Sequence, residues 1–131
     1  MQNLSSQTRV LVVDDNRDAA EVLQMLLQMN DYDVRVAFDG KSGFELAAEF
    51  RPQVICSHLN MPGISGFELA SELRISKHSG NAYLIAITGL NTEDSYIKAT
   101  KSGFDSCLTK PFAIEELLAL IRNGTESKLK N

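Results

Sequence analysis

The stretch VLVVDDN at residues 10–16 joins four consecutive aliphatic residues directly to two carboxylates and an amide. An apolar run rich in β-branched residues is typical of a strand that is covered on both faces, as in a parallel sheet. The polar residues after it suit a turn and the N-cap of a helix. The stretch therefore predicts a buried strand that ends in a polar loop and leads into a helix.

Apolar runs of the same kind recur along the chain. Strands are predicted at residues 10–13, 34–37, 54–56, 84–87 and 107–108, and the segments between them have a helical period. Because strands and helices alternate through five repeats, the sequence predicts an open, doubly wound α/β fold with a parallel sheet and helices on both faces. We expect the domain to span residues 9–123, with polar tails at 1–8 and 124–131.

The predicted helices differ in how clearly they are amphipathic. Apolar stripes mark a first helix (Ala19, Val22, Leu23, Leu26, Leu27), a third over 67–74 (Leu69, Ala70, Leu73) and a fifth (Ile114, Leu117, Leu118, Ile121). The fourth, over 92–102, has only Tyr96, Ile97 and Ala99 to bury. The fifth is expected to end at Asn123-Gly124, because this pair is typical of a helix stop.

Composition narrows the class of protein. The chain has 131 residues, 44% of them hydrophobic, and a formal net charge of -4, which suits one globular domain. Basic residues are scattered, which argues against direct binding of nucleic acid or an anionic membrane. Apolar runs are too short to span a membrane, and the first eight residues lack the features of a secretory signal. We therefore expect a cytoplasmic protein.

The two cysteines, Cys56 and Cys107, both lie in short apolar stretches. Two cysteines do not make a disulfide framework, and neither has metal-ligand spacing to another cysteine or histidine. Both are expected to be small core residues.

Polar residues follow several of the predicted strands. They are Asp14 and Asp15 after the first, His58 and Asn60 after the third, Thr88 after the fourth and Lys110 after the fifth. Because ligands of open α/β sheets bind outside the carboxyl ends of the strands, these groups should converge on one site. Each also fits a plainer role on its own, since Asp14, Asp15 and Asn16 suit a turn and helix cap, and Lys110-Pro111 a surface turn.

Five short motifs together resemble the receiver domain of two-component response regulators, over residues 8–123. They are VVDDN at 12–16, LNMPG at 59–63 with Gly66, IAITG at 85–89, GFD at 103–105 and LTKPF at 108–112. Their order and spacing make the resemblance specific. The sequences of these motifs are most similar to those of receivers attached to hybrid sensor kinases.

The resemblance implies a flavodoxin-like (CheY-like) sheet of five strands in the order 2-1-3-4-5, with five helices. Receivers accept a phosphoryl group from a phosphohistidine onto an aspartate at the end of the third strand. By this resemblance Asp14 and Asp15 match the pair that binds Mg²⁺, and Asn60 matches the residue whose carbonyl completes the metal shell. Thr88 matches the switch hydroxyl, and Lys110 the lysine that contacts the phosphoryl oxygens.

Two positions depart from the family pattern. His58 stands where the acceptor aspartate is expected, and no carboxylate occurs among the residues just before it. Because Mg²⁺ prefers oxygen ligands, the loss of a carboxylate predicts a weakened magnesium site. Cys107 stands at the switch position of the fifth strand, where the family often has an aromatic ring or histidine; a cysteine is too small to swing as a ring does.

Several hypotheses about function stay open on these residues. The favoured one is a degenerate receiver that is not an enzyme and acts as a protein-interaction module independent of phosphorylation. The alternatives are a phosphoacceptor that uses His58, Ser57 or Asp14, and a working receiver that carries an engineered Asp-to-His change. A small nucleotide- or metal-dependent enzyme is disfavoured, because the sequence lacks a glycine-rich phosphate loop.

The resemblance also implies protein partners: a sensor histidine kinase, a phosphotransfer domain or an output domain. By family analogy the output surface is the face formed by the fourth helix, fifth strand and fifth helix. The same face would carry any homodimer contact.

Overall fold

The computed structural model of the chain describes residues 7–89 and 92–129, and within them strands and helices alternate strictly. The strands are β1 (Arg9–Val13), β2 (Asp33–Ala37), β3 (Val54–His58), β4 (Tyr83–Thr88) and β5 (Ser106–Thr109). The helices are α1 (Arg17–Gln28), α2 (Gly40–Phe50), α3 (Gly66–Ile75), α4 (Glu93–Ser102) and α5 (Ile114–Leu129). The predicted alternation is confirmed, with strands one or two residues longer than the apolar runs.

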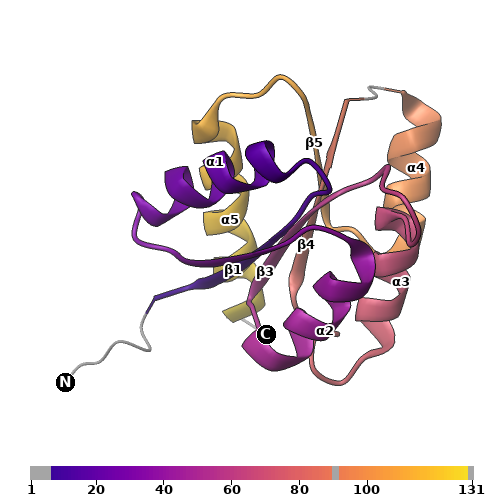
Figure 1. Cartoon of the computed structure of the whole chain (residues 1–131), viewed down its shortest axis with the longest axis horizontal. Helices are drawn as coiled ribbons and strands as arrows, with labels where there is room; N and C mark the ends of the chain where they lie inside the picture. Colours follow the sequence, from indigo (N-terminus) through magenta and orange to yellow (C-terminus); the bar gives the residue numbers. More distant parts are fainter. Residues whose placement is uncertain (1–6, 90–91, 130–131) are drawn as a thin grey trace.

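All neighbouring strands are parallel, and the sheet order is β2-β1-β3-β4-β5 (Figure 1). The chain therefore has the expected flavodoxin-like α/β fold. The order changes direction at β1 and β3, so the loops that follow these two strands diverge to opposite faces and leave a crevice between them.

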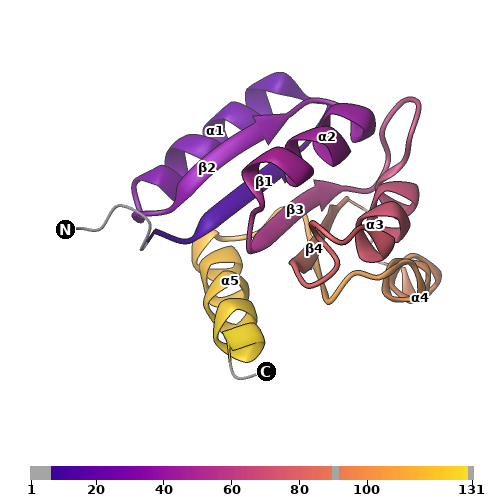
Figure 2. The same cartoon turned by 90° about the horizontal axis from the view of Figure 1, so that it is seen from below.

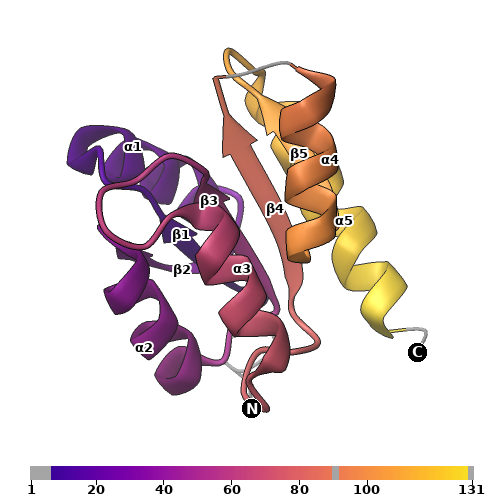
Figure 3. The ribbon, with the colours of Figure 1, turned by 90° about the vertical axis from the view of Figure 1, so that its right-hand side faces the viewer.

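The two faces of the sheet are buried in separate apolar clusters, with α1 and α5 over one face and α2, α3 and α4 over the other (Figures 1 and 2). Leu11 and Ile55 belong to the cluster under α2, α3 and α4, whereas Val10 and Cys56 belong to the cluster under α1 and α5. Side chains thus alternate along each strand, as the pleat requires. Figure 3 shows α4 and α5 on either side of β5 at one end of the sheet.

The buried face of α1 differs from the predicted stripe. Ala20 and Leu27 are fully buried, whereas Val22 is 55% exposed. Gln24 also lies on the sheet side, where its Nε2 donates to the carbonyl of Val34 at 3.1 Å. The apolar surface of α1 is wider than the sheet can cover, so part of it, including Met25, faces solvent.

The prediction that the fifth helix ends at Asn123-Gly124 is wrong, because α5 continues to Leu129. Gly124 packs against the ring of Tyr83, and a Cβ at this position would overlap that ring. The glycine therefore allows a close approach of helix and sheet rather than a helix end.

The apolar residues of α4 are also placed differently than expected. Ala99 is 1% exposed and joins the cluster with Leu73 and Phe104. Tyr96 and Ile97, which were expected to be buried, are 58% and 41% exposed. A helix that is anchored through one small residue presents the rest of its surface to solvent. Among the described helices, none is both long and apolar enough to span a membrane.

Candidate functional site

The register of the sheet brings the first and third strand ends together. Val13 pairs with Ser57 in the parallel ladder between β1 and β3. Asp14 and His58 therefore leave their strands side by side. The backbone N–H of Asp14 still donates to the carbonyl of Ala37 at 3.1 Å, which fixes the start of the loop.

Asp14, Asp15 and His58 form one cluster. One carboxylate oxygen of each aspartate and a ring nitrogen of His58 all lie within 4.8 Å of one another. Asp14 is buried, His58 is half-buried and Asp15 is exposed, so the cluster is open on one side. The predicted convergence of these three residues is confirmed, although their roles stay predictions.

Asn16 caps α1, as the plainer interpretation of the loop predicted. Its side-chain oxygen accepts from the N–H of Ala19 at 3.0 Å. The N–H of Asn16 in turn donates to Oδ1 of Asp14 at 2.9 Å. The loop therefore caps the helix and also orients a site residue. Asn16 caps α1, and its backbone N–H holds the Asp14 carboxylate in place.

The histidine ring is oriented by the loop that follows it. Nδ1 of His58 lies 3.2 Å from the carbonyl oxygen of Asn60. The N–H of Gly66 donates to the carbonyl of Leu59 at 2.8 Å, and a Cβ on Gly66 would overlap the carbonyl of His58. The start of α3 thus packs directly on the end of β3 and fixes the backbone that carries the ring.

Lys110 completes the polar side of the crevice. Its Nζ lies 3.9 Å from Oδ2 of Asp14, and its side chain is 38% exposed. Its backbone N–H donates to the carbonyl of Thr88 at 2.8 Å, so the ends of β4 and β5 are joined. Thr88 is buried beside Thr109, and the Lys110–Pro111 peptide is cis.

The remaining candidate residues lie away from this cluster. Ser57 is 1% exposed, lies on the α2–α3 face of β3 by strand alternation, and donates its hydroxyl to the carbonyl of His58 at 3.0 Å. Cys107 is half-buried against the cluster under α3 and α4. Burial raises the pKa of the Cys107 thiol, and it raises the pKa of Cys56 to about 12. Both thiols therefore stay protonated near neutral pH, as expected of core cysteines.

The donor set fits Mg²⁺ poorly. Mg²⁺ demands near-octahedral oxygen ligands, and this crevice offers two carboxylates. The third side chain of the cluster is an imidazole, and the Asn60 carbonyl faces that ring. An imidazole in place of a carboxylate removes one negative charge and one oxygen.

An apolar groove beside the cluster was missed by the sequence analysis. It has a volume of about 490 Å³ and runs between α1 and the segment that leads into α5. Val22, Leu26 and Phe112 line it, and Asp14 and Lys110 close its polar end. The excess width of the α1 stripe was the available indication, because Val22 and Leu26 lie beyond the part of the stripe that the sheet covers.

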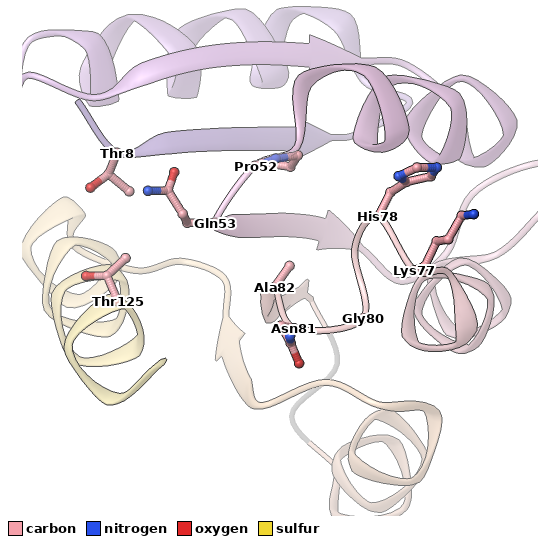
Figure 4. A pocket seen from close by; sticks show the side chains of 9 residues that line it. All are labelled: Thr8, Pro52, Gln53, Lys77, His78, Gly80, Asn81, Ala82 and Thr125. Atoms are coloured by element: carbon pink, nitrogen blue, oxygen red, sulfur yellow. The ribbon is translucent and has the colours of Figure 1, made fainter. Parts of the chain in front are cut away.

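A second cavity lies at the opposite end of the sheet and is unrelated to the cluster (Figure 4). It has a volume of about 340 Å³. Thr8, Gln53 and Ala82, which line it, come just before β1, β3 and β4. His78 and Lys77 border its other side (Figure 4).

Comparisons with known proteins agree with this architecture. The family model of the response regulator receiver domain matches residues 10–122. The DNA-binding dual master transcriptional regulator RpaA of Synechocystis is 34% identical over 114 residues, covering 87% of this chain and 47% of that protein. Response regulator MprA of Mycolicibacterium vanbaalenii is 35% identical over 87% of this chain and 48% of its own length. The chain thus spans about half the length of these curated relatives.

Solved structures give the same result. The chemotaxis response regulator CheY4 of Vibrio cholerae superposes with a TM-score of 0.85 at 28% identity, over 91% of this chain and 99% of that one. The receiver domain of the Francisella response regulator 1452 superposes with a TM-score of 0.82 at 33% identity, over 92% and 99%.

Proposed function

The chain belongs to the response regulator receiver domain family of two-component systems, and from this premise we propose that it is a degenerate receiver. It acts as a protein-interaction module whose output does not depend on phosphorylation at position 58. The observation that carries the proposal is His58 itself, which stands at the family's acceptor position.

The surroundings of His58 support this reading. Oδ1 of Asp14 accepts from the backbone N–H of Asn16, and its Oδ2 lies 3.9 Å from the Lys110 ammonium, so both contacts compete with attack on a phosphoryl group. Ser57 is buried on the other face of the strand. The Nδ1 of His58 faces the Asn60 carbonyl. In-line attack requires a nucleophile held in reach of the phosphoryl donor, and these neighbours are poorly placed for it.

Magnesium binding is proposed to be weak, because the cluster offers two carboxylates and an imidazole whereas Mg²⁺ prefers oxygen ligands. Without that ion, the charge that builds up on a transferring phosphoryl group would lack its main counter-charge. A third class of function, a small nucleotide- or metal-dependent enzyme, receives no support from the residues around the crevice, and we propose that the domain is not an enzyme.

The proposed partners are proteins: a sensor histidine kinase, a phosphotransfer domain or an output domain. Two surfaces support this. One is the apolar groove between α1 and the start of α5, and the other is the exposed side of α4 with Tyr96 and Ile97. Contiguous exposed apolar surface, rather than single apolar side chains, is typical of interaction sites. The second surface is also proposed to carry any homodimer contact.

The net charge of -4 disfavours direct binding of nucleic acid by this domain. We also propose a cytoplasmic location. The similarity of the five sequence motifs to those of hybrid sensor kinases supports a place among the receivers of such kinases. RpaA, a relative that binds DNA, is about twice as long as the segment it shares with this chain.

Intact-mass spectrometry tests the proposal. Native protein and His58→Asp are incubated with Mg²⁺ and acetyl phosphate, a small-molecule phosphodonor. The native protein is expected to keep its mass, and the variant to gain one phosphoryl group. His58→Asn serves as the matched control, because it restores neither a carboxylate nor an imidazole.

A phosphorylated native protein would contradict the proposal and indicate another acceptor, which fragmentation of the modified protein would locate. If His58→Asp stays unmodified as well, the pocket is degraded beyond this one residue. In that case the native domain is still independent of phosphorylation.

A further inference from the structure

The cluster at the ends of β1 and β3 is a mixed donor set rather than a group of carboxylates. One nitrogen and two oxygens, from Asp14, Asp15 and His58, lie within 4.8 Å of one another. We infer that this site selects Zn²⁺, or a divalent transition ion of the same class, in place of the Mg²⁺ that receivers bind.

The chemistry of the ligands carries the selectivity. Mg²⁺ is bound by oxygen and dehydrates reluctantly, whereas Zn²⁺ accepts imidazole nitrogen and carboxylate oxygen in a four-coordinate shell. Imidazole ligands suit Zn²⁺, Cu²⁺ and Ni²⁺ rather than Mg²⁺. Three protein ligands that leave one position for water are the usual number of an open zinc site.

The contact at Nδ1 gives a second reason. Metal-binding histidines almost always donate the other ring N–H to a carboxylate, a carbonyl or a water, which fixes the tautomer and the ring orientation. Nδ1 of His58 is 3.2 Å from the Asn60 carbonyl. When Nδ1 carries the proton and donates to that carbonyl, Nε2 is the ring nitrogen that is left to bind a metal ion.

The charges also agree. Two carboxylates and a neutral imidazole balance a divalent ion without a third acidic group. Asp14 is buried, so part of the site is shielded from water, while Asp15 is exposed and leaves an entry path. The Lys110 ammonium, 3.9 Å from Asp14, has a 38% exposed side chain and room to turn toward solvent when an ion enters.

The inference rests on the proposed function in one respect, since both require that the pocket is not a working magnesium and phosphoryl site. Their tests remain separate. Phosphorylation is read from the intact mass, whereas ion selectivity is read from equilibrium affinity in the absence of any phosphodonor. Either can fail while the other holds.

The test is a calorimetric titration of the full chain at equilibrium, with ZnCl₂ alone and, separately, with MgCl₂ alone. Native protein is expected to bind one Zn²⁺ more tightly than Mg²⁺. His58→Ala should lower the affinity for Zn²⁺ by about 10- to 100-fold or more. Removing even a residue that only hydrogen-bonds to a metal ligand typically costs 10- to 100-fold in metal affinity. His58→Asp should shift the preference toward Mg²⁺, and circular dichroism confirms that each variant is folded.

The chain offers a matched control, because it contains only two histidines. His78 borders the cavity at the opposite end of the sheet (Figure 4). His78→Gln should leave the Zn²⁺ affinity unchanged, and Cys107→Ser should do the same. Zn²⁺ binding that survives His58→Ala, or that is lost equally in His78→Gln, would overturn the inference and show an adventitious ion only. Native protein that binds Mg²⁺ as tightly as His58→Asp does would also overturn it.

Discussion

Nδ1 of His58 lies 3.2 Å from the carbonyl oxygen of Asn60, two residues further along the chain. By the family resemblance, Asn60 matches the residue whose carbonyl completes the magnesium shell, so the imidazole faces the carbonyl that the resemblance assigns to the ion. The ring therefore has a partner within its own loop. A histidine at the end of β3 is therefore accommodated by the fold.

Gly66→Ala should destabilise the domain by roughly 1–3 kcal/mol, the usual cost of overpacking. The new methyl group would overlap the carbonyl of His58 and push α3 away from β3. Urea unfolding followed by circular dichroism measures the change. Gly89→Ala is the control, because its Cβ would meet no atom within 4 Å, and it should change stability by less than about 0.5 kcal/mol. Equal effects of the two variants would show that the contact with His58 is not tight.

Arg74→Ala should cost about 1.5–3 kcal/mol, because charged hydrogen bonds between elements are lost. Its guanidinium donates to the carbonyls of Gly103 and Ala82 at 2.8 and 2.6 Å, and it pairs with Asp105 at 2.5 Å. This side chain thus ties α3 to the segments that lead into β4 and β5. Thermal unfolding at fixed pH measures the loss.

Arg35→Ala provides the comparison for Arg74, since its guanidinium stacks on the Phe50 ring at 4.5 Å. It should cost no more than about 0.5–1 kcal/mol, as is usual for an exposed cation–π pair. A loss for Arg74→Ala that does not exceed this value would contradict the interpretation of Arg74 as a bridge.

The two cysteines should differ in reactivity toward iodoacetamide at pH 8. Cys56 is fully buried and its pKa is raised to about 12, so it should be modified only when the domain unfolds. Cys107 is half-buried and its pKa is also raised by burial, so it should react slowly but first. Mass spectrometry follows the modification. The folded Cys107→Ser variant should therefore stay unmodified. Modification of Cys56 at the same rate as Cys107 would contradict the buried position of β3.

Asp39→Ala should destabilise the domain by about 1 kcal/mol at pH 7, because the Asp39 side chain caps α2. The backbone N–H of Ser42 donates to this carboxylate at 2.7 Å and lowers its pKa. A carboxyl with a lowered pKa in the folded state contributes stability above its unfolded pKa of about 3.9. That contribution is lost as the pH falls through the folded pKa.

The difference in stability between native protein and Asp39→Ala should therefore shrink below about pH 4. Urea unfolding at pH 7 and at pH 3 measures it. Asp39→Asn keeps an acceptor for Ser42 and should lose less stability than Asp39→Ala. A difference between native protein and Asp39→Ala that grows on acidification would contradict this assignment.

Much of the fold could be predicted from the sequence, because continuous apolar runs and helical periods are local patterns. The strand order came from the family resemblance and is confirmed. Rotation of helices and their ends could not be predicted in the same way. Whether Ala19 or Ala20 faces the sheet depends on how α1 packs against β2. The role of Gly124 within α5 depends on its contact with the ring of Tyr83, which lies 41 positions earlier in the chain.

The candidate site was predictable in membership but not in geometry. Strand ends of a parallel sheet share an edge, so the convergence of Asp14, Asp15 and His58 followed from topology. The contact between His58 and Asn60 depends on a ring orientation that no pattern encodes. The groove beside α1 was missed because the Val22 side was assigned to the core.

A degenerate receiver should have a conformation that does not respond to phosphorylation chemistry at position 58. Amide NMR spectra of native protein and His58→Asp, each with and without Mg²⁺ and acetyl phosphate, test it most directly. Mg²⁺ alone is recorded as the reference for each protein. Adding phosphodonor is expected to leave the native spectrum unchanged and to shift the α4, β5 and α5 resonances of His58→Asp. Phosphodonor-dependent shifts in the native protein would contradict it.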